Sequence, residues 1–195
     1  MQHSAHLIGV SVMIALVLFG CSSGAESREV LLRRDGQDRH WVVRRHGLIV
    51  EEHYLTAHGD IPVVIEYAKG VRTPQVDSKQ KEKAGTSRVR MFWAKDKMMS
   101  ETSAFDGEAH GPDRVWWQSG KLAREAVFEH GKPVGLWKFY RPSGELLGEG
   151  TFKDAKRQSG VFLVLDNPGG DFFFGHEMQV FENGNVIRKE EFRER

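Results

Sequence analysis

Four histidines lie close together near the start of the chain, and they are the first candidates for chemistry. His40, His46, His53 and His58 fall within 19 positions. Two imidazoles that meet across a hairpin can bind zinc or copper. Scattered, solvated histidines explain the same spacing more simply, so the sequence predicts no metal and no other cofactor.

The sequence contains none of the motifs that place a catalytic group. There is no G-x-S-x-G, H-E-x-x-H or P-loop pattern, and His176-Glu177 lacks the second histidine four positions later. Gly144, Gly148 and Gly150 do not fit the dinucleotide fingerprint, and no helix is expected after them. Gly148 and Gly150 are expected to be close-packing positions inside a strand. The sequence therefore predicts that the protein is not an enzyme.

The N-terminal segment is apolar and ends near Cys21, the single cysteine. The first 20 residues contain no Asp, Glu, Lys or Arg. The apolar run over 7–19 would span about 20 Å as a helix, which is shorter than the roughly 30 Å of a bilayer core. A secretory signal peptide over residues 1–20 fits this length better than a transmembrane helix.

The residues around Cys21 carry a resemblance to a known export signal. Leu18-Phe19-Gly20-Cys21 resembles the lipobox of bacterial lipoproteins, in which the cysteine is acylated and becomes the mature N-terminus. The resemblance implies an acylated Cys21, a flexible tether over residues 21–28, and anchoring to a membrane of the cell envelope. In a cell with two membranes, Ser22 favours the outer membrane, with the protein facing the periplasm. A lone thiol in an ordinary apolar segment is the alternative.

The charge balance excludes one class of partner. The chain has 28 Lys and Arg against 27 Asp and Glu, a formal net charge of +1. Nucleic-acid binding calls for a strongly basic face, so no nucleic-acid partner is expected.

A short unit that recurs along the chain predicts the fold. An aromatic residue, a Ser-Gly turn and Leu-x-x-Glu-x-x-Phe appear over 116–128 and return 24 residues later over 140–152. The predicted turn positions are Gly47, Lys97, Gly120, Gly144 and Gly184. Apolar residues stand four positions before, two after and eight after each of them. Positions two and eight after the turn have the same parity, so on a regular strand they share one face, which is the predicted core.

Each unit is therefore expected to be a β-hairpin, and the hairpins must pack side by side to bury their aromatic residues. The predicted core includes Phe105, Phe128 and Phe152. Glutamates five positions after the turn (Glu52, Glu125 and Glu149) are expected on the opposite, solvated face.

The repeat predicts one all-β domain over residues 29–195, an antiparallel meander of consecutive hairpins in a single-layer or curved sheet. Two stretches interrupt its rhythm. A polar, lysine-rich stretch near 73–87 is expected to be an exposed loop, and an inserted hairpin is expected near 160–175.

One copy of the unit resembles a known repeat family. The pattern Gly135-x-Trp137-x-x-Tyr140-x-x-x-Gly144-x-Leu146-x-x-Glu149-x-x-Phe152 resembles the MORN repeat, and is closer still to the bacterial MORN variant of YwqK-type antitoxin proteins. The resemblance covers 88–195 well and 38–59 loosely. It implies a curved antiparallel meander and a protein-binding scaffold; some members of the family contact phospholipid.

Aromatic residues crowd the two best copies and supply candidate binding residues. Trp117 has the opposite parity to the core position Trp116, so it is expected to be exposed beside Arg141 of the next unit. Trp117, Arg141 and Trp137 are therefore the predicted binding residues.

The expected function is a membrane-anchored scaffold that binds a protein partner through its repeats. A module that contacts lipid or cell-wall glycan is the first alternative, and an antitoxin-like binding protein is the second.

Overall fold

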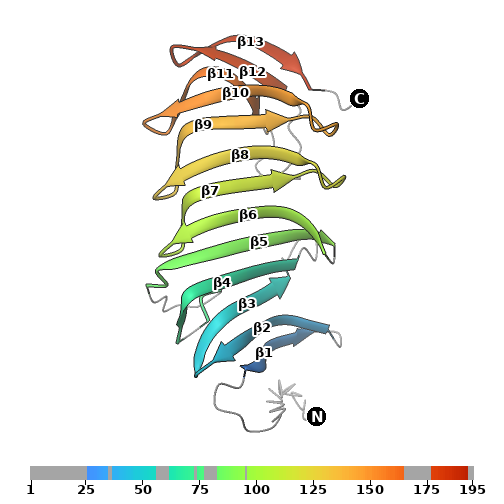
Figure 1. Ribbon diagram of the computed structural model, residues 1–195, viewed down its shortest axis with the longest axis vertical. Coiled ribbons are helices and arrows are strands. Elements are labelled where there is room, and N and C mark those ends of the chain that lie inside the picture. The colour runs from blue at the N-terminus through green and yellow to red at the C-terminus, as the bar shows by residue number, and fades with distance from the viewer. Residues whose placement is uncertain are drawn as a thin grey trace, which may run out of the picture.

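The protein folds as one open, single-layer antiparallel sheet of thirteen strands in chain order (Figure 1). The computed structural model describes residues 26–34, 37–55, 62–72, 74–76, 83–94, 96–164 and 177–192. The strands are β1 Glu26–Arg34, β2 Gln37–Arg45, β3 Leu48–Leu55, β4 Pro62–Val71, β5 Thr86–Ala94, β6 Lys97–Phe105, β7 Glu108–Trp116, β8 Leu122–Glu129, β9 Lys132–Tyr140, β10 Leu146–Lys153, β11 Lys156–Val164, β12 Glu177–Glu182 and β13 Asn185–Glu191. The described residues contain no helix, which confirms the predicted all-β meander.

Some expected segments lie wholly or partly outside the described residues. The signal peptide over 1–20 and Cys21 are among them, as is 165–175 of the predicted inserted hairpin. The tether was expected to reach residue 28, but β1 already begins at Glu26. Within the described ranges, no helix is long and apolar enough to cross a membrane.

Tight turns of one kind join the strands at one end of the sheet. The turns after β2, β6, β8, β10 and β12 each have two residues with positive φ. His130-Gly131, for example, has φ values of 47° and 73°. Positive φ at both central residues is the geometry of a type I′ turn, whose twist matches that of the flanking strands.

Longer turns lie at the opposite end. The turns centred on Gly120 and Gly144 are closed by equivalent hydrogen bonds, in which Trp117 N donates to Lys121 O and Arg141 N donates to Glu145 O, both at 2.8 Å. The predicted register placed Gly47 and Gly184 with these two glycines, which is wrong. They follow even-numbered strands, so they lie at the other end of an antiparallel meander, half a repeat away.

Positions two and eight after the turn were predicted to share one face of the strand, and a β-bulge in β10 shows that this is wrong. Leu146 pairs with Tyr140, but after a register shift Phe152 pairs with Gly135. The extra residue at Leu147 reverses the alternation, so Leu146 and Phe152 point to opposite faces. Leu146 is consequently 48% exposed, while Phe152 packs into the core.

We call the face that carries Phe152 the core face. A continuous column of rings crosses it from β8 to β12: Phe128, Trp137, Phe152, Phe162 and Phe181, with successive ring centroids 5.2, 4.6, 5.1 and 5.4 Å apart. The column confirms the predicted aromatic core for Phe128 and Phe152. Phe105 does not belong to it, because it ends β6 beside a turn and is 45% exposed.

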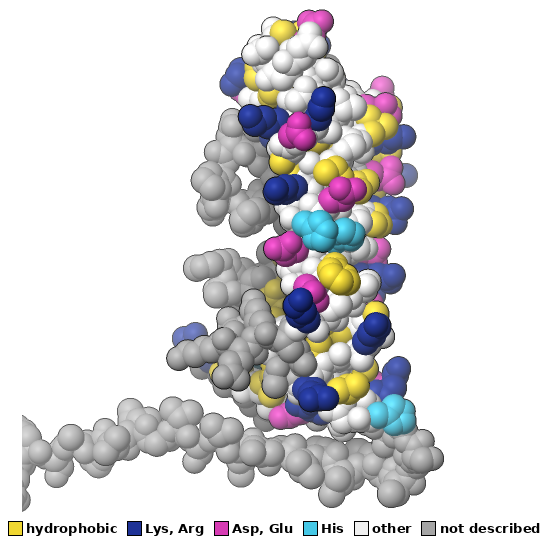
Figure 2. Space-filling view, turned by 90° about the vertical axis from the view of Figure 1, so that its left-hand side faces the viewer, with side chains coloured by type: hydrophobic (Ala, Val, Ile, Leu, Met, Phe, Trp, Pro, Cys, Tyr) yellow, Lys and Arg dark blue, Asp and Glu magenta, His cyan; other side chains and the backbone are white. Residues whose placement is uncertain are grey.

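The sheet curves toward the core face at its C-terminal end. Trp117 follows β7 and Phe192 follows β13, yet their rings are stacked with centroids 6.2 Å apart. Six strand spacings in a flat sheet would separate them by about 29 Å. Figure 2 shows the sheet edge-on, as a tall, narrow body.

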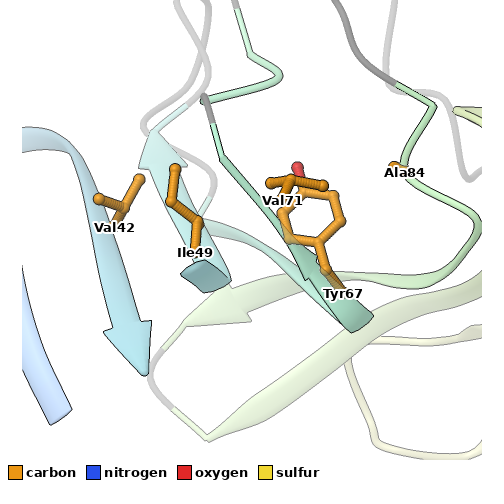
Figure 3. Close-up of a cluster of buried hydrophobic side chains, with 5 residues drawn as sticks. All are labelled: Val42, Ile49, Tyr67, Val71 and Ala84. Atoms are coloured by element: carbon orange, nitrogen blue, oxygen red, sulfur yellow. The ribbon is translucent and has the colours of Figure 1, made fainter. Parts of the chain in front are cut away.

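A separate cluster fills the core face of the N-terminal strands. Val42, Ile49, Tyr67, Val71 and Ala84 are all buried, and Figure 3 shows the side chains of β2 to β4 converging there. The buried Ala84 and the half-buried 74–76 belong to the stretch that the sequence marked as an exposed loop. Where this stretch is described, it therefore packs on the sheet.

Strand β10 contains glycines where the side chains of the neighbouring strand β11 leave no room for a Cβ. A Cβ on Gly150 would overlap the Phe162 ring, and a Cβ on Gly148 would lie 2.6 Å from that of Val161. This confirms the close-packing role that the sequence predicts.

We expect Gly150→Ala to lower the free energy of unfolding by about 1–3 kcal/mol, because the added methyl group must displace Phe162. Urea denaturation would measure the loss. The neighbouring Thr151→Ala, on the exposed side of the same strand, is the control and should change stability by no more than about 0.5 kcal/mol. Equal stability of the two variants would contradict the packing of Phe162 over Gly150.

Candidate functional site

The three residues predicted to bind a partner do not form an exposed surface. Trp117 is 3% exposed and Trp137 is 8% exposed. Arg141 is half-buried. The prediction that Trp117 is exposed is wrong, because strand alternation was carried through a residue that already belongs to the turn.

Trp117 and Trp137 both pack in the hydrophobic core. The indole N–H of Trp117 donates to Tyr140 O at 3.1 Å, and that of Trp137 donates to Val127 O at 3.3 Å. The Arg124 guanidinium lies 5.1 Å from the Trp137 ring centroid and donates to Asp113 Oδ1 at 2.6 Å. A buried ring with a satisfied N–H stabilises the fold and offers no contact area to a partner.

The opposite face carries a row of alternating charges, and we call it the charged face. Strand register brings six charged residues into line across β5 to β10: Arg90, Glu101, Arg114, Glu125, Lys138 and Glu149. Each cation in the interior of the row lies between two carboxylates. Arg114 Nε lies 3.5 Å from Glu125 Oε1, and Lys138 Nζ lies 3.5 Å from Glu149 Oε1. In Figure 2, dark blue and magenta side chains alternate along the right-hand profile of the sheet.

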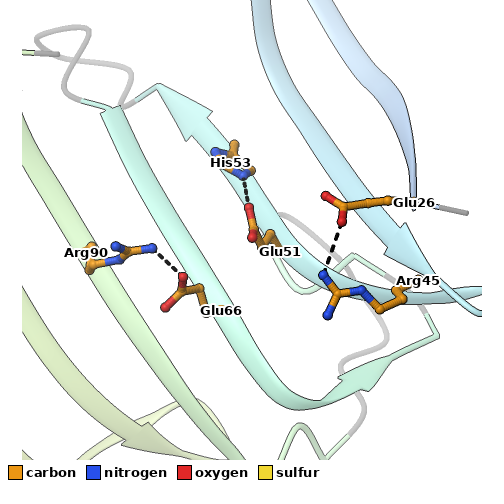
Figure 4. Close-up of polar contacts among 6 residues, drawn as sticks. All are labelled: Glu26, Arg45, Glu51, His53, Glu66 and Arg90. Atoms are coloured by element: carbon orange, nitrogen blue, oxygen red, sulfur yellow. Dashed lines mark hydrogen bonds and ion pairs between the residues drawn. The ribbon is translucent and has the colours of Figure 1, made fainter. Parts of the chain in front are cut away.

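Ion pairs continue on the charged face over the first five strands. Figure 4 shows Glu26 with Arg45, Glu51 with His53, and Glu66 with Arg90. Glu51 and His53 lie on the same strand, β3, whereas the other two pairs join neighbouring strands. Cross-strand pairs contribute about 0.2–1 kcal/mol each, so they stabilise strand register more than they add to overall stability. The solvated position that the sequence predicts for Glu125 and Glu149 is confirmed, with side chains 38% and 41% exposed.

Aliphatic side chains flank the charged row. Val127, Leu136 and Leu146 are 40%, 46% and 48% exposed, and the register places them on the charged face of β8 to β10. Tyr140 pairs with Leu146 on the same face, and its hydroxyl donates to Glu125 Oε2 at 2.9 Å. Burial, together with this hydrogen bond, raises the pKa of Tyr140. The charged face of β7 to β10 therefore combines half-exposed apolar groups with ordered charges of both signs.

Glu52 contradicts its predicted position on a solvated face. Its side chain is fully buried on the core face, because Gly47 belongs to the other kind of turn and the predicted register does not apply to β3. Four donors surround the carboxylate. Oε1 lies 2.7 Å from His40 Nε2 and 3.0 Å from Val76 N, and Oε2 accepts from the Tyr67 hydroxyl and from Gln75 N, both at 2.8 Å.

The environment of Glu52 favours its charged form. Burial would raise the pKa of this carboxyl, but the hydrogen bonds from His40, Tyr67 and the two backbone N–H groups outweigh burial and lower it. Burial, and then the Glu52 charge, raise the pKa of Tyr67. No local sequence pattern indicates this cluster, because its members come from β2, β3, β4 and the segment after β4.

Two of the four histidines considered for metal binding have other partners. His40 contacts Glu52, and His53 Nε2 lies 2.8 Å from Glu51 Oε2 while its ring stacks on Trp41. His46 is exposed in the β2–β3 turn, and His58 is outside the described residues. In the parts of the chain that the structure describes, no group of three or more His, Cys, Asp or Glu side chains is arranged to hold a metal ion.

Comparison with known families places a MORN repeat variant at residues 133–154. This segment covers β9 from its second residue, the turn centred on Gly144, and all of β10, so it corresponds to one hairpin of the sheet. A search of curated proteins finds no match. The repeat architecture fits an interaction scaffold.

Proposed function

We propose that this protein is a lipid-anchored scaffold of the cell envelope and that its charged face binds a protein partner. The observation that carries the proposal is the charged face of β7 to β10, where half-exposed aliphatic side chains lie beside an ordered row of charges. Repeat proteins commonly bind through such extended surfaces. Ordered charges of both signs select a complementary partner more than they add affinity.

The anchor is the part of the proposal that rests on the sequence. Two acyl chains on Cys21 would contribute about 0.8 kcal/mol per buried methylene group, which suffices for stable attachment. The stretch from Cys21 to Glu26, where β1 begins, can reach at most about 18 Å when extended. An acylated Cys21 would therefore keep the β1 end of the sheet near the membrane.

The first test addresses the anchor. We expect Cys21→Ala to abolish incorporation of radiolabelled palmitate and to move the protein from the membrane fraction to the soluble fraction. Ser22→Ala, next to the cysteine, is the matched control and should keep both the label and the membrane association. A Cys21→Ala variant that still takes up palmitate would refute acylation at this residue.

The second test addresses the partner. A photo-crosslinking amino acid at Leu136, on the charged face, should give one reproducible protein adduct in cells. The same amino acid at Ile187 of β13, which is 60% exposed, should not. Glu149→Lys in the Leu136 background should weaken the adduct at least tenfold, because it reverses one charge of the row.

The outcomes separate the proposal from its alternatives. Adducts to lipid or glycan in place of protein would favour the first alternative, a module that contacts lipid or cell-wall glycan. An adduct that is equally strong at Leu136 and Ile187 would contradict a binding role for the charged face.

A further inference from the structure

We propose that a cavity on the core face of β3 to β6 binds a neutral, largely apolar small molecule that carries a hydrogen-bond donor. The cavity has a volume of about 410 Å³, within the usual range of small-molecule sites. It lies on the other side of the sheet from the charged face, so it is independent of the proposed scaffold surface.

The floor of the cavity is apolar. Ile65, Val89 and Ala104 project into it from three successive strands, and Ala84 closes one side. Ala84 and Ala104 are 7% and 5% exposed. Two alanines at these positions leave the space open where larger aliphatic side chains would fill it.

The polar groups of the wall decide the chemistry of the ligand. Glu52 already takes the N–H groups of Gln75 and Val76 and the hydroxyl proton of Tyr67. The phenol oxygen of Tyr67 and the carboxylate of Asp106, whose Oδ1 accepts from Gly85 N at 2.8 Å, have acceptor capacity. The wall therefore suits a ligand that donates a hydrogen bond.

The charges around the cavity restrict the class of ligand further. Among the described residues that line the cavity there is no Lys, Arg or His, and Asp106 adds a negative charge at its edge. An anion placed there would meet repulsion from Asp106 with no compensating cation among these described residues. The site thus selects neutral molecules over anionic molecules of the same shape.

Glu52 is a positioning residue for this cavity. It lies behind the wall and holds Tyr67 from β4 and the backbone at 75–76, all of which line the cavity. Without this carboxylate, two parts of the wall would lose their common anchor.

A matched pair of fluorescent probes tests the proposal on the full chain. N-phenyl-1-naphthylamine is neutral, largely apolar and carries one N–H donor, while 8-anilino-1-naphthalenesulfonate has the same rings and an added anionic sulfonate. We expect saturable binding of the neutral probe, and affinity at least tenfold lower for the sulfonate.

Two substitutions locate the binding. Ala104→Leu fills the cavity and should lower the affinity for the neutral probe at least tenfold. Ala94→Leu, exposed at the end of β5, is the control and should leave its affinity unchanged. Probe bound to other apolar parts of the chain contributes equally to all variants, so the difference between them reports the cavity.

A third substitution tests the charge at the rim and guards against a folding defect. Asp106→Asn keeps a side chain that tolerates the positive φ of 49° at this residue. This substitution should raise the affinity for the sulfonate probe without lowering the affinity for the neutral probe. Equal binding of the neutral probe to the unaltered chain and Ala104→Leu, or equal affinity of the two probes in the unaltered chain, would overturn the proposal.

Discussion

Phe162→Ala is expected to lower the free energy of unfolding by about 3–5 kcal/mol, the usual cost of removing a large buried aromatic side chain. Phe162 is 1% exposed and belongs to the ring column, with centroids 5.1 Å from Phe152, 5.4 Å from Phe181 and 6.0 Å from Phe139. The facing residue, Gly150, has no side chain that could fill the resulting cavity.

Phe105→Ala is the matched control for this experiment. It removes the same atoms from a ring that is 45% exposed, so it should cost less than about 1 kcal/mol. Urea denaturation followed by circular dichroism would measure both losses. Similar losses for the two variants would show that the column at Phe162 is not the core of the sheet.

The effect of Phe162→Ala should also be local. In a repeat protein each unit contacts only its neighbours, so stability is lost mainly where the substitution lies. We expect amide hydrogen exchange to accelerate in β9 to β12 and to change little in β2 to β4.

Glu52→Ala is expected to have the second large effect, again about 3–5 kcal/mol. The substitution leaves two backbone N–H groups, the Tyr67 hydroxyl and His40 without their common acceptor in a buried place. Glu125→Ala, on the charged face, is the control. It removes an exposed carboxylate and should cost no more than about 1 kcal/mol.

Lowering the pH should remove the contribution of Glu52 to the free energy of unfolding. The pKa of Glu52 is lowered in the folded protein, so its contribution is fully present above the ordinary glutamate pKa of about 4.3 and is lost as pH falls below that value toward the lowered pKa. Glu52→Gln keeps the shape of the side chain and cannot titrate. The stability gap between the unaltered protein and Glu52→Gln should therefore shrink as the pH falls from 7 to 3.

A gap that stays constant over this range would contradict a charged Glu52 in the folded state. Urea denaturation at several pH values gives the measurement. Other carboxylates titrate in both proteins, so their contributions cancel in the difference.

Much of the charged face follows from local pattern. Glu125 and Glu149 stand one repeat apart, and strand alternation alone places them on the solvated side of β8 and β10. The core positions are less regular, because the bulge at Leu147 reverses the alternation within β10 and exposes Leu146. A single inserted residue of this kind has no mark in the sequence that distinguishes it from its neighbours.

The sequence by itself determined that the chain forms consecutive hairpins, since turn residues and alternating apolar positions act over a few residues. It also determined that Phe128 and Phe152 belong to one aromatic core and that Gly148 and Gly150 give it room. Only the tertiary structure decided that Trp117 is buried and that Glu52 gathers donors from three separate segments. The physical reason is distance along the chain: the curvature that stacks Phe192 on Trp117, and the contacts of residues 40, 67 and 75–76 with Glu52, arise from packing between segments that no local pattern relates.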